Sequence, residues 1–470
     1  MANQQESNRD CIRYKLYRAY YVFENNALPD SLTMDLMMNK SDILFTDEEV
    51  DEIVHSSSLK LLDLIDPIIE TRGSIDVPDI WKLDEHLISL FRSKGNVLHQ
   101  YHLYSPGKCL LTGGYLILDK GNHGLSLGLS AHCHSFVSVK SVTENVALIT
   151  IDSPEMKGHW EYRINERKRL EVVKESEENL FLLHSISKSV DVLSSVEHLM
   201  HKHIKMRITS DGSFFYQKDS RTHKLGFGSS ATTVVSVVCS LLMEGGKLDM
   251  KMCLIRSLLD EERELIARVA CDAHNTAQGR IGSGFDVITA VFGSCCFEKT
   301  DTFCIHSPFS LPPHIAIALS CGGQGSSRTP VLVRQMKNWR EKEESKGLWE
   351  EYSENNESLV RALCEGRVNE LKNLFEVKLE IMHTISECSG SQIVPDALYK
   401  VMKATNDLEG VVGCIVAGAG GFDSFYCLYD DRKTQRKAFE ALWNQCDCSV
   451  SSIRDNSQGL QITSSEMNCG

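Results

Sequence analysis

Long apolar runs are missing from this 470-residue sequence. The longest candidate covers residues 231–243 and is interrupted by Thr and Ser, whereas a membrane-spanning helix needs about 18 or more apolar residues. We therefore expect no membrane partner. Basic residues are also in short supply, because 64 Asp and Glu outnumber 50 Lys and Arg and give a net charge of -14. Such a charge repels polyanions, so we do not expect nucleic acid as a partner.

Paired cysteine motifs are absent as well. The 17 cysteines are scattered, with no CxxC pair and no Cys/His spacing of the zinc-finger type, and we interpret them as reduced, mostly buried thiols. The nearest approach to a metal cluster is His132-Cys133-His134. Its flanking residues alternate as in a strand, which puts the two imidazoles on one face and the thiol on the other. We expect plain strand residues there.

Targeting signals are not recognisable at either end. Residues 1–10 lack a basic stretch followed by an apolar core, and the last four residues are neither a peroxisomal nor a retention signal. A cytoplasmic location is the expectation.

The chain changes character near residue 98. Residues 1–98 contain few glycines and show helical periodicity, for example in the apolar stripe of Ile80, Leu83 and Leu87. We predict a helical extension there, either a packed appendage or a docking or regulatory module. Beyond it, short apolar segments of strand length are followed by helical segments. This order predicts an α+β architecture in two lobes.

Three loops of small and polar residues stand out, at 105–108 with 113–114, at 226–231 and at 418–423. The middle loop, GFGSSA, is the most informative. Its two glycines let the backbone approach a ligand closely, and Ser229 and Ser230 stand where a helix would begin. Free backbone N–H groups at a helix start attract phosphate, and serine hydroxyls can add a hydrogen bond or hold a magnesium ion. Because the following residues are rich in β-branched side chains, propensity alone does not settle that this segment is a helix.

The same GFGSSA string also fits the dinucleotide fingerprint GxGxxG/A, with Glu244 near the position expected for the acidic residue. That fingerprint needs an apolar strand directly before the first glycine, and residues 217–224 are polar. A nicotinamide-dependent dehydrogenase is therefore the weaker alternative.

Asp286 is the most interesting carboxylate. It follows a small-residue loop at a predicted helix start, where its ionised form is favoured and its side chain can reach a ligand. A purely structural role as a helix cap is the competing interpretation. Four basic residues lie in or beside the glycine loops and could face the same space: Lys108, Lys224, Arg280 and Arg328.

The order and spacing of these loops resemble the GHMP kinase superfamily and, within it, the phosphomevalonate kinases of the yeast and plant type. The segments that carry the resemblance run from residue 105 to the end of the chain. They are SPGKCLLTGGYLIL (105–118), KLGFGSSATTVVSVV (224–238), AHNTAQGRIGSGFDVITAVFGS (273–294), GGQGSSRTP (322–330) with KNW (337–339), and AGAGGFDSFYCL (417–428).

The resemblance implies an ATP-binding lobe over residues 99–310 and a second lobe over 311–470. It also implies magnesium-dependent transfer of the γ-phosphate of ATP to 5-phosphomevalonate, in the mevalonate route to isoprenoids, with small molecules as the partners. The implied site consists of Lys108 and Asp286 for catalysis; Gly226, Gly228, Ser229, Ser230 and Ala231 for ATP; Lys108, Arg280, Ser283, Ser327, Arg328, Gly420 and Gly421 for the acceptor substrate; and Ser230 for Mg²⁺.

The sequence departs from the family pattern at a few positions. Leu225 and Ala417 stand where Thr and Pro are usual, and Arg328 stands where Ser is common, which adds a cation beside the substrate loop. The magnesium-binding Glu of mevalonate kinases has no counterpart in residues 274–278. Another small-molecule kinase of the superfamily, such as a mevalonate kinase, and a non-catalytic ligand sensor remain as alternatives.

Overall fold

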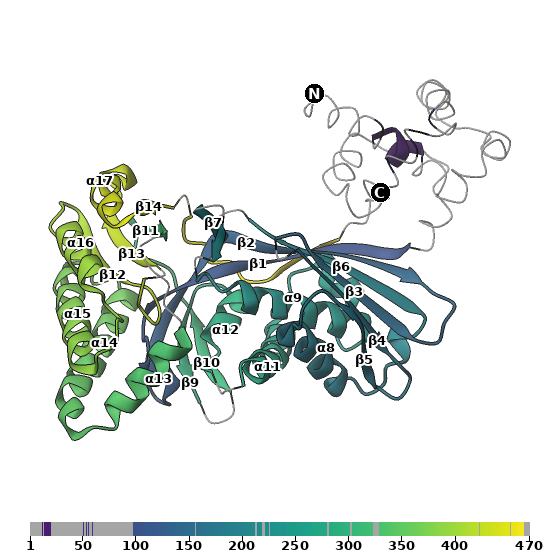
Figure 1. Cartoon of the computed structure of the whole chain (residues 1–470), viewed down its shortest axis with the longest axis horizontal. Coiled ribbons are helices and arrows are strands. Elements are labelled where there is room, and N and C mark those ends of the chain that lie inside the picture. The colour runs from purple at the N-terminus through teal and green to yellow at the C-terminus, as the bar shows by residue number, and fades with distance from the viewer. Residues whose placement is uncertain are drawn as a thin grey trace.

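The protein is described by a computed structural model (Figure 1). It describes residues 97–464 except 156, 212–213, 219–220, 225, 280–281, 301–302, 323–328, 423 and 452. Within the first 96 residues it describes only positions 12, 14–19, 50, 53, 55 and 59. The helical extension predicted for residues 1–98 therefore lies almost entirely outside the described residues.

The first lobe is built on a nine-stranded sheet. The strand order is β10-β9-β2-β6-β3-β4-β5, and β1 pairs with both β2 and β15. The β3–β6 pair is parallel, and the other pairs run antiparallel. The strands are β1 (Val97–Thr112), β2 (His123–Ser141), β3 (Ala147–Ser153), β4 (Gly158–Ile164), β5 (Leu170–Glu175), β6 (Lys202–Ser210), β9 (Cys295–Lys299), β10 (Cys304–Pro308) and β15 (Gln461–Ser464).

Helices cover one face of this sheet, as Figure 1 shows for α8, α9, α11 and α12. Helix α9 (Ser229–Glu244) lies at the centre, and all of its residues from 231 to 244 are buried. Propensity alone did not settle whether this segment is a helix. It is one, because packing on every side outweighs the weak helix propensity of its β-branched residues. The other helices are α8 (Leu180–Val192), α10 (Met250–Ile255), α11 (Asp260–Ala277) and α12 (Phe285–Phe292).

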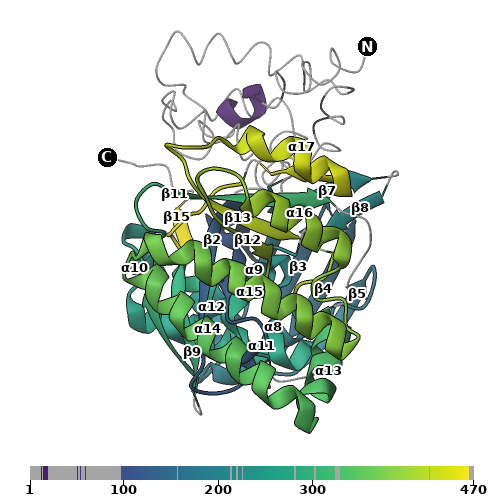
Figure 2. The same cartoon turned by 90° about the vertical axis from the view of Figure 1, so that its left-hand side faces the viewer.

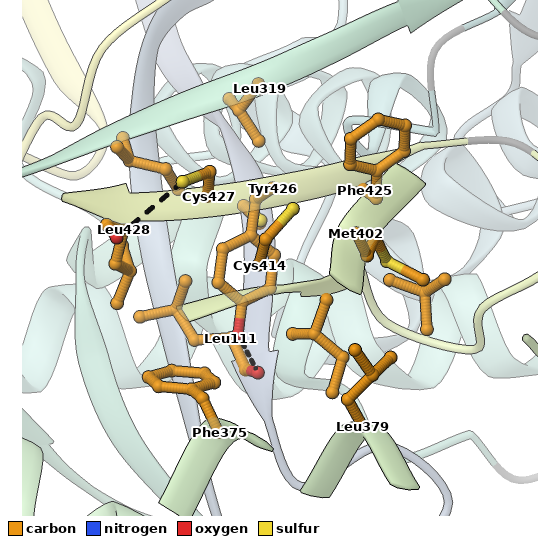
Figure 3. Packing of buried hydrophobic residues seen from close by; sticks show 14 of the residues in the cluster. Leu111, Leu319, Phe375, Leu379, Met402, Cys414, Phe425, Tyr426, Cys427 and Leu428 are labelled. Atoms are coloured by element: carbon orange, nitrogen blue, oxygen red, sulfur yellow. Dashed lines mark hydrogen bonds between the residues drawn. The ribbon is translucent and has the colours of Figure 1, made fainter. Parts of the chain in front are cut away.

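The second lobe contains a four-stranded sheet in the order β12-β13-β11-β14. Figure 2 shows α14, α15 and α16 lying across the outer face of this lobe. In its core, Phe375 and Leu379 of α15 point toward Tyr426 of β13 (Figure 3). The elements are β11 (Ile315–Gly322), α13 (Thr329–Arg340), α14 (Lys346–Cys364), α15 (Val368–Ser389), α16 (Asp396–Asn406), β12 (Val411–Val416), β13 (Phe425–Asp430), α17 (Glu440–Trp443) and β14 (Cys448–Val450).

The predicted two-lobed α+β architecture is confirmed. One apolar cluster fills the first lobe, and a second fills the other lobe and also takes in the ends of β1 and β2. We propose a lobe boundary near residue 310, with β15 returning to pair with β1 of the first lobe. Among the described residues, no helix combines the length and the apolar character needed to cross a membrane.

The first predicted loop is wrong in one respect, because residues 105–108 lie inside β1 rather than in a loop. The pairing of β1 with β2 shifts register between Pro106 and Lys108, so the strand bulges there. A Cβ atom on Gly107 would lie 2.9 Å from the ring of Phe214, which explains the glycine at this close approach. Strand pairing, which local sequence does not reveal, thus fixes the direction of Lys108.

A buried lysine lies where the lobes meet. Lys378 of α15 is 2% exposed, and its ammonium group donates to Thr112 Oγ1 of β1 and to Asn356 Oδ1 of α14. Burial lowers the pKa of Lys378 to about 7, although the charge of Glu357 acts in the opposite direction. A titratable amine is thus held in the interior with hydrogen bonds to neutral groups.

We expect this burial to make stability depend on pH. Between pH 7 and 10.5, the unfolded lysine keeps its proton while the folded one loses it. The free energy of unfolding of the wild type should therefore rise relative to Lys378→Met by about 1.4 kcal/mol per pH unit in this range, and the difference should level off below pH 7. Chemical denaturation from pH 6 to 9 measures it, with exposed Lys372→Met as the control. A difference that does not change with pH would contradict the expectation.

Candidate functional site

Residues from all three predicted glycine motifs line a single cavity of about 600 Å³. Lys108 of β1, the turn before α9 and the start of α12 come from the first lobe. The loop 417–420 reaches it from the second lobe. The cavity therefore lies where the two lobes meet, and it is large enough for a small-molecule ligand.

The turn 226–228 and the first residues of α9 form one wall of the cavity. Gly226 and Gly228 have φ angles of 72° and 87°, a region that favours glycine. A Cβ on Gly228 would also lie 3.0 Å from Lys108 Cγ. Ser229 and Ser230 open the helix, and the N–H groups of a first helical turn have no partner within the helix. This wall is therefore suited to bind an anion such as phosphate.

Lys108 links this wall to the start of α12. Its ammonium group donates to Gly226 O at 2.8 Å and lies 5.1 Å from the centre of the Phe285 ring. Its backbone N–H donates to Phe227 O at 2.9 Å. These contacts hold a positive charge beside the anion-binding turn.

Asp286 lies in the first turn of α12, directly after Gly284 and Phe285. Its Oδ1 accepts a hydrogen bond from Val287 N at 3.0 Å, and its side chain is 21% exposed. Gly284 has a φ of 81°, so the turn that presents the carboxylate depends on glycine. The N-cap of α12 is Gly284, so Asp286 is a first-turn residue rather than the cap, and its carboxylate also lines the cavity.

His274 of α11 is a cavity residue that the sequence analysis missed. It is 3% exposed, and its Nε2 lies 3.2 Å from Ser230 Oγ and 3.8 Å from Asp286 Oδ2. The sequence analysis noted residues 274–278 only because they lack the magnesium-binding Glu of mevalonate kinases. The available signal was a histidine on the buried face of an amphipathic helix, but Ser230 and Asp286 beside it belong to other helices.

The third loop closes the cavity from the second lobe. Gly418 N donates to Leu110 O at 3.2 Å, and Tyr115 Oη donates to Ala419 O at 2.5 Å. Gly420 has a φ of 74°, and a Cβ there would lie 2.2 Å from the carbonyl oxygen of Ile393. No larger residue fits at position 420 without a backbone shift.

The predicted site residues fall into three groups by position. Lys108, Gly226, Gly228, Ser229, Ser230, Ser283, Asp286 and Gly420 line the cavity. Ala231 is buried inside α9, and Gly421 N donates to Ile393 O at 2.8 Å. Arg280, Ser327 and Arg328 lie outside the described residues.

The dinucleotide alternative is not supported by the surroundings of GFGSSA. The residues before it form a two-stranded hairpin of β7 (Phe215–Lys218) and β8 (Arg221–Lys224), not a buried parallel strand. Glu244 is buried and bound by His99 at 2.7 Å and Lys202 at 2.9 Å. Burial alone would raise the pKa of Glu244, but the contacts with His99 and Lys202 lower it. This carboxylate is buried and paired with His99 and Lys202, so it cannot contact a ribose.

The histidines of β2 are strand residues, as predicted. His132 and His134 share Asp211 as a hydrogen-bond partner, through the backbone N–H of His132 and the ring of His134. Over the part of the chain that the structure describes, no group of three or more His, Cys, Asp or Glu side chains could hold a metal ion.

The chain is similar in sequence to known phosphomevalonate kinases, although no protein-family model matches it. It is 26% identical over 397 residues to the phosphomevalonate kinase of Gibberella zeae, an alignment that covers 71% of this chain and 88% of that protein. It is 23% identical to the peroxisomal phosphomevalonate kinase of Arabidopsis thaliana, with 69% of this chain and 88% of that protein covered.

Solved structures show the same fold. The phosphomevalonate kinase of Streptococcus pneumoniae, solved with phosphomevalonate and AMPPNP, matches with a TM-score of 0.56 and 18% identity over 76% of this chain and 99% of that one. The L. major mevalonate kinase, solved with R-mevalonate, matches with a TM-score of 0.53 and 15% identity over 76% and 96%. The chain therefore has the GHMP kinase fold, and in sequence it resembles the phosphomevalonate kinases of fungi and plants.

Proposed function

We propose that the protein is a phosphomevalonate kinase, which transfers the γ-phosphate of ATP to 5-phosphomevalonate and produces 5-diphosphomevalonate and ADP. One observation carries the proposal. Lys108, the GFGSS turn at the start of α9 and Asp286 line the same cavity in a chain that resembles phosphomevalonate kinases. Because both Lys108 and Asp286 line it, a non-catalytic ligand sensor is the weaker candidate.

In this proposal the ATP phosphates lie at the start of α9. The N–H groups of its first turn, the hydroxyls of Ser229 and Ser230 and the ammonium group of Lys108 would bind them. Phosphoryl transfer needs alignment and charge neutralisation more than covalent help from the protein, and these groups supply both.

The donor set is compatible with Mg²⁺. This ion prefers oxygen ligands and usually takes only one or two from the protein, completing its shell with water and phosphate oxygens. Ser230 Oγ is such a donor beside the phosphate position, so we propose that Ser230 holds the ion together with ATP. When bound, Mg²⁺ would neutralise charge on the phosphates. The nearby His274 supplies nitrogen rather than the carboxylate that mevalonate kinases use.

The acceptor is itself a phosphate whose second pKa is about 6, so at neutral pH it is mostly a nucleophilic dianion. One of its oxygens forms a bond to the γ-phosphorus while the bond from that phosphorus to the bridging oxygen breaks, and ADP leaves. A strong base is not required. We propose that Asp286 orients this reaction together with Lys108 and accepts a proton only from the minority monoanion.

The remaining predicted residues are proposed to bind the acceptor. Ser283 and Gly420 line the cavity, which supports this role for them. The two arginines would pair with the acceptor phosphate, since guanidinium groups bind phosphate through two hydrogen bonds. The full proposed set is Lys108, Arg280, Ser283, Ser327, Arg328, Gly420 and Gly421.

A coupled ADP assay tests the proposed function. Purified protein should produce ADP from ATP and 5-phosphomevalonate in the presence of Mg²⁺, and phosphorus NMR should show a diphosphate product. Mevalonate is the comparison substrate, because mevalonate kinases share this fold, and we expect its kcat/KM to be at least about tenfold lower, since a site built for a charged group rejects analogues that lack it. Full activity in excess EDTA, or equal turnover of mevalonate, would contradict the proposal.

For the compartment we propose the cytoplasm. The Arabidopsis relative is named as peroxisomal, so the two locations need a direct comparison. Imaging a fluorescent fusion of the protein together with a peroxisomal marker compares the two locations. Overlap with the marker would contradict the proposal.

A further inference from the structure

Successive residues at the end of β1 accept hydrogen bonds from donors in the second lobe. Gly418 N donates to Leu110 O at 3.2 Å. At the next position, Tyr426 Oη donates to Leu111 O at 2.5 Å, the contact drawn as a dashed line in Figure 3. Both partners belong to the second lobe, so this strand end is fixed across the lobe junction rather than within its own sheet alone.

The turn that follows is held in the same way. Tyr352 of α14 donates through its hydroxyl to Gly114 O at 2.9 Å. Tyr115 donates to Ala419 O, and both Gly114 and Tyr115 line the cavity. Burial raises the pKa of Tyr115 well above its usual value, so its hydroxyl remains a donor. The cavity-lining turn is thus positioned by groups that do not all line the cavity themselves.

Thr112, which lies between Leu111 and the turn, is contacted by Lys378. The Lys378 ammonium group donates to Thr112 Oγ1, which donates in turn to Asn356 Oδ1 at 2.5 Å. Asn356 Nδ2 donates to His123 O at 2.9 Å, at the start of β2. A single buried network therefore joins α14 and α15 to β1 and β2, on either side of the turn.

Burying the Lys378 ammonium group in this network costs free energy. The Lys378 side chain is almost fully buried, and its nitrogen lies 5.2 Å from the centre of the Tyr352 ring, where a cation is attracted to the ring face. Burial disfavours its charged form, and the charge of Glu357 offsets this only in part. An apolar side chain of the same length would avoid the cost, so a contribution to stability is a weak explanation for a lysine at this position.

We propose that Lys378 is a positioning residue, which acts through Thr112 to hold the turn 113–115 against the 418–420 loop and so shapes the acceptor side of the cavity. The inference rests on the kinase activity proposed above. The turn contacts the loop that contains Gly420 rather than the start of α9. Loss of the network should therefore affect the acceptor more than ATP.

Steady-state kinetics on the full chain tests the proposal. Lys378→Met removes the ammonium group, and Thr112→Val removes the hydroxyl while preserving shape. Each should raise the KM for 5-phosphomevalonate about tenfold or more, because displaced binding groups and lost charged hydrogen bonds have effects of this order. The KM for ATP should stay within about twofold. The double variant should be no worse than either single variant, since both remove the same interaction.

Two matched controls separate positioning from simple destabilisation. Thr112→Ser keeps the hydroxyl and should retain a near-normal KM, and Lys372→Met removes an exposed lysine from the same helix. Because KM does not depend on the fraction of folded enzyme, a loss of stability alone would leave both KM values unchanged.

The outcomes are distinct. An acceptor KM within twofold of wild type for Thr112→Val would overturn the proposal, even if Lys378→Met failed to fold. Absence of any turnover of 5-phosphomevalonate by the wild type would instead overturn the proposed function. Equal increases in both KM values would overturn the assignment to the acceptor side.

Discussion

Replacing Asp286 with Asn should lower kcat with 5-phosphomevalonate by about 100-fold at neutral pH, because losing a group that aligns the reacting atoms can cost a factor of about 10². The amide is nearly the same size as the carboxylate, and its oxygen can still accept the hydrogen bond from Val287 N. The start of α12 should therefore be preserved. What is lost is the negative charge and the ability to accept a proton in the cavity.

The pH dependence of this loss is the sharper measurement. Below about pH 6 the acceptor is mainly the monoanion, whose proton must be removed before or during transfer. The difference in kcat between wild type and Asp286→Asn should therefore grow as pH falls from 8 to 5.5. Asp191→Asn, at an exposed position of α8, is the control and should change little. A loss of less than about threefold at all pH values would mean that the carboxylate has no role in transfer.

Replacing Lys108 with Met should reduce kcat/KM for ATP by about 10² to 10³, the range typical of removing one preorganised charge-stabilising donor. The methionine keeps most of the length of the side chain but can neither donate to Gly226 O nor neutralise phosphate charge. The 226–228 turn therefore loses one fixed contact along with the positive charge.

Measuring kcat and KM separately shows where Lys108 acts. If its main effect is on the transferred phosphoryl group, kcat falls more than the affinity for ATP. Lys205→Met, which removes an exposed lysine of β6, controls for the change in net charge. Activity within fivefold of wild type would exclude Lys108 from the phosphate site.

Some features of the site were accessible from sequence because they depend on short-range chemistry. The GFGSS turn needs glycines with positive φ, and the serines after it begin a helix, so a few adjacent residues define this wall of the cavity. Asp286 was accessible for the same reason, since it follows a glycine turn at a helix start. The identity of the acceptor was not. It came from resemblance to a family, because no residue pattern in this chain specifies phosphomevalonate from physical principles alone.

Other features depend on contacts between distant residues. Residues 105–108 looked like a loop but belong to a bulged strand, because pairing with β2 satisfies their backbone groups. His274 lies beside Ser230 and Asp286 only because α9, α11 and α12 pack together. None of these partners could be predicted from spacing.

The sequence by itself determined the α+β class, the order of strands before helices, and the three glycine motifs with Lys108 and Asp286, since periodicity and turn chemistry are local properties. The tertiary structure alone decided that these motifs share one cavity at the lobe junction. It also decided that Lys378 meets Thr112 across 266 residues of chain. The physical reason is that a buried polar group must find its partner wherever the fold provides one, and such partners carry no signature in the local sequence.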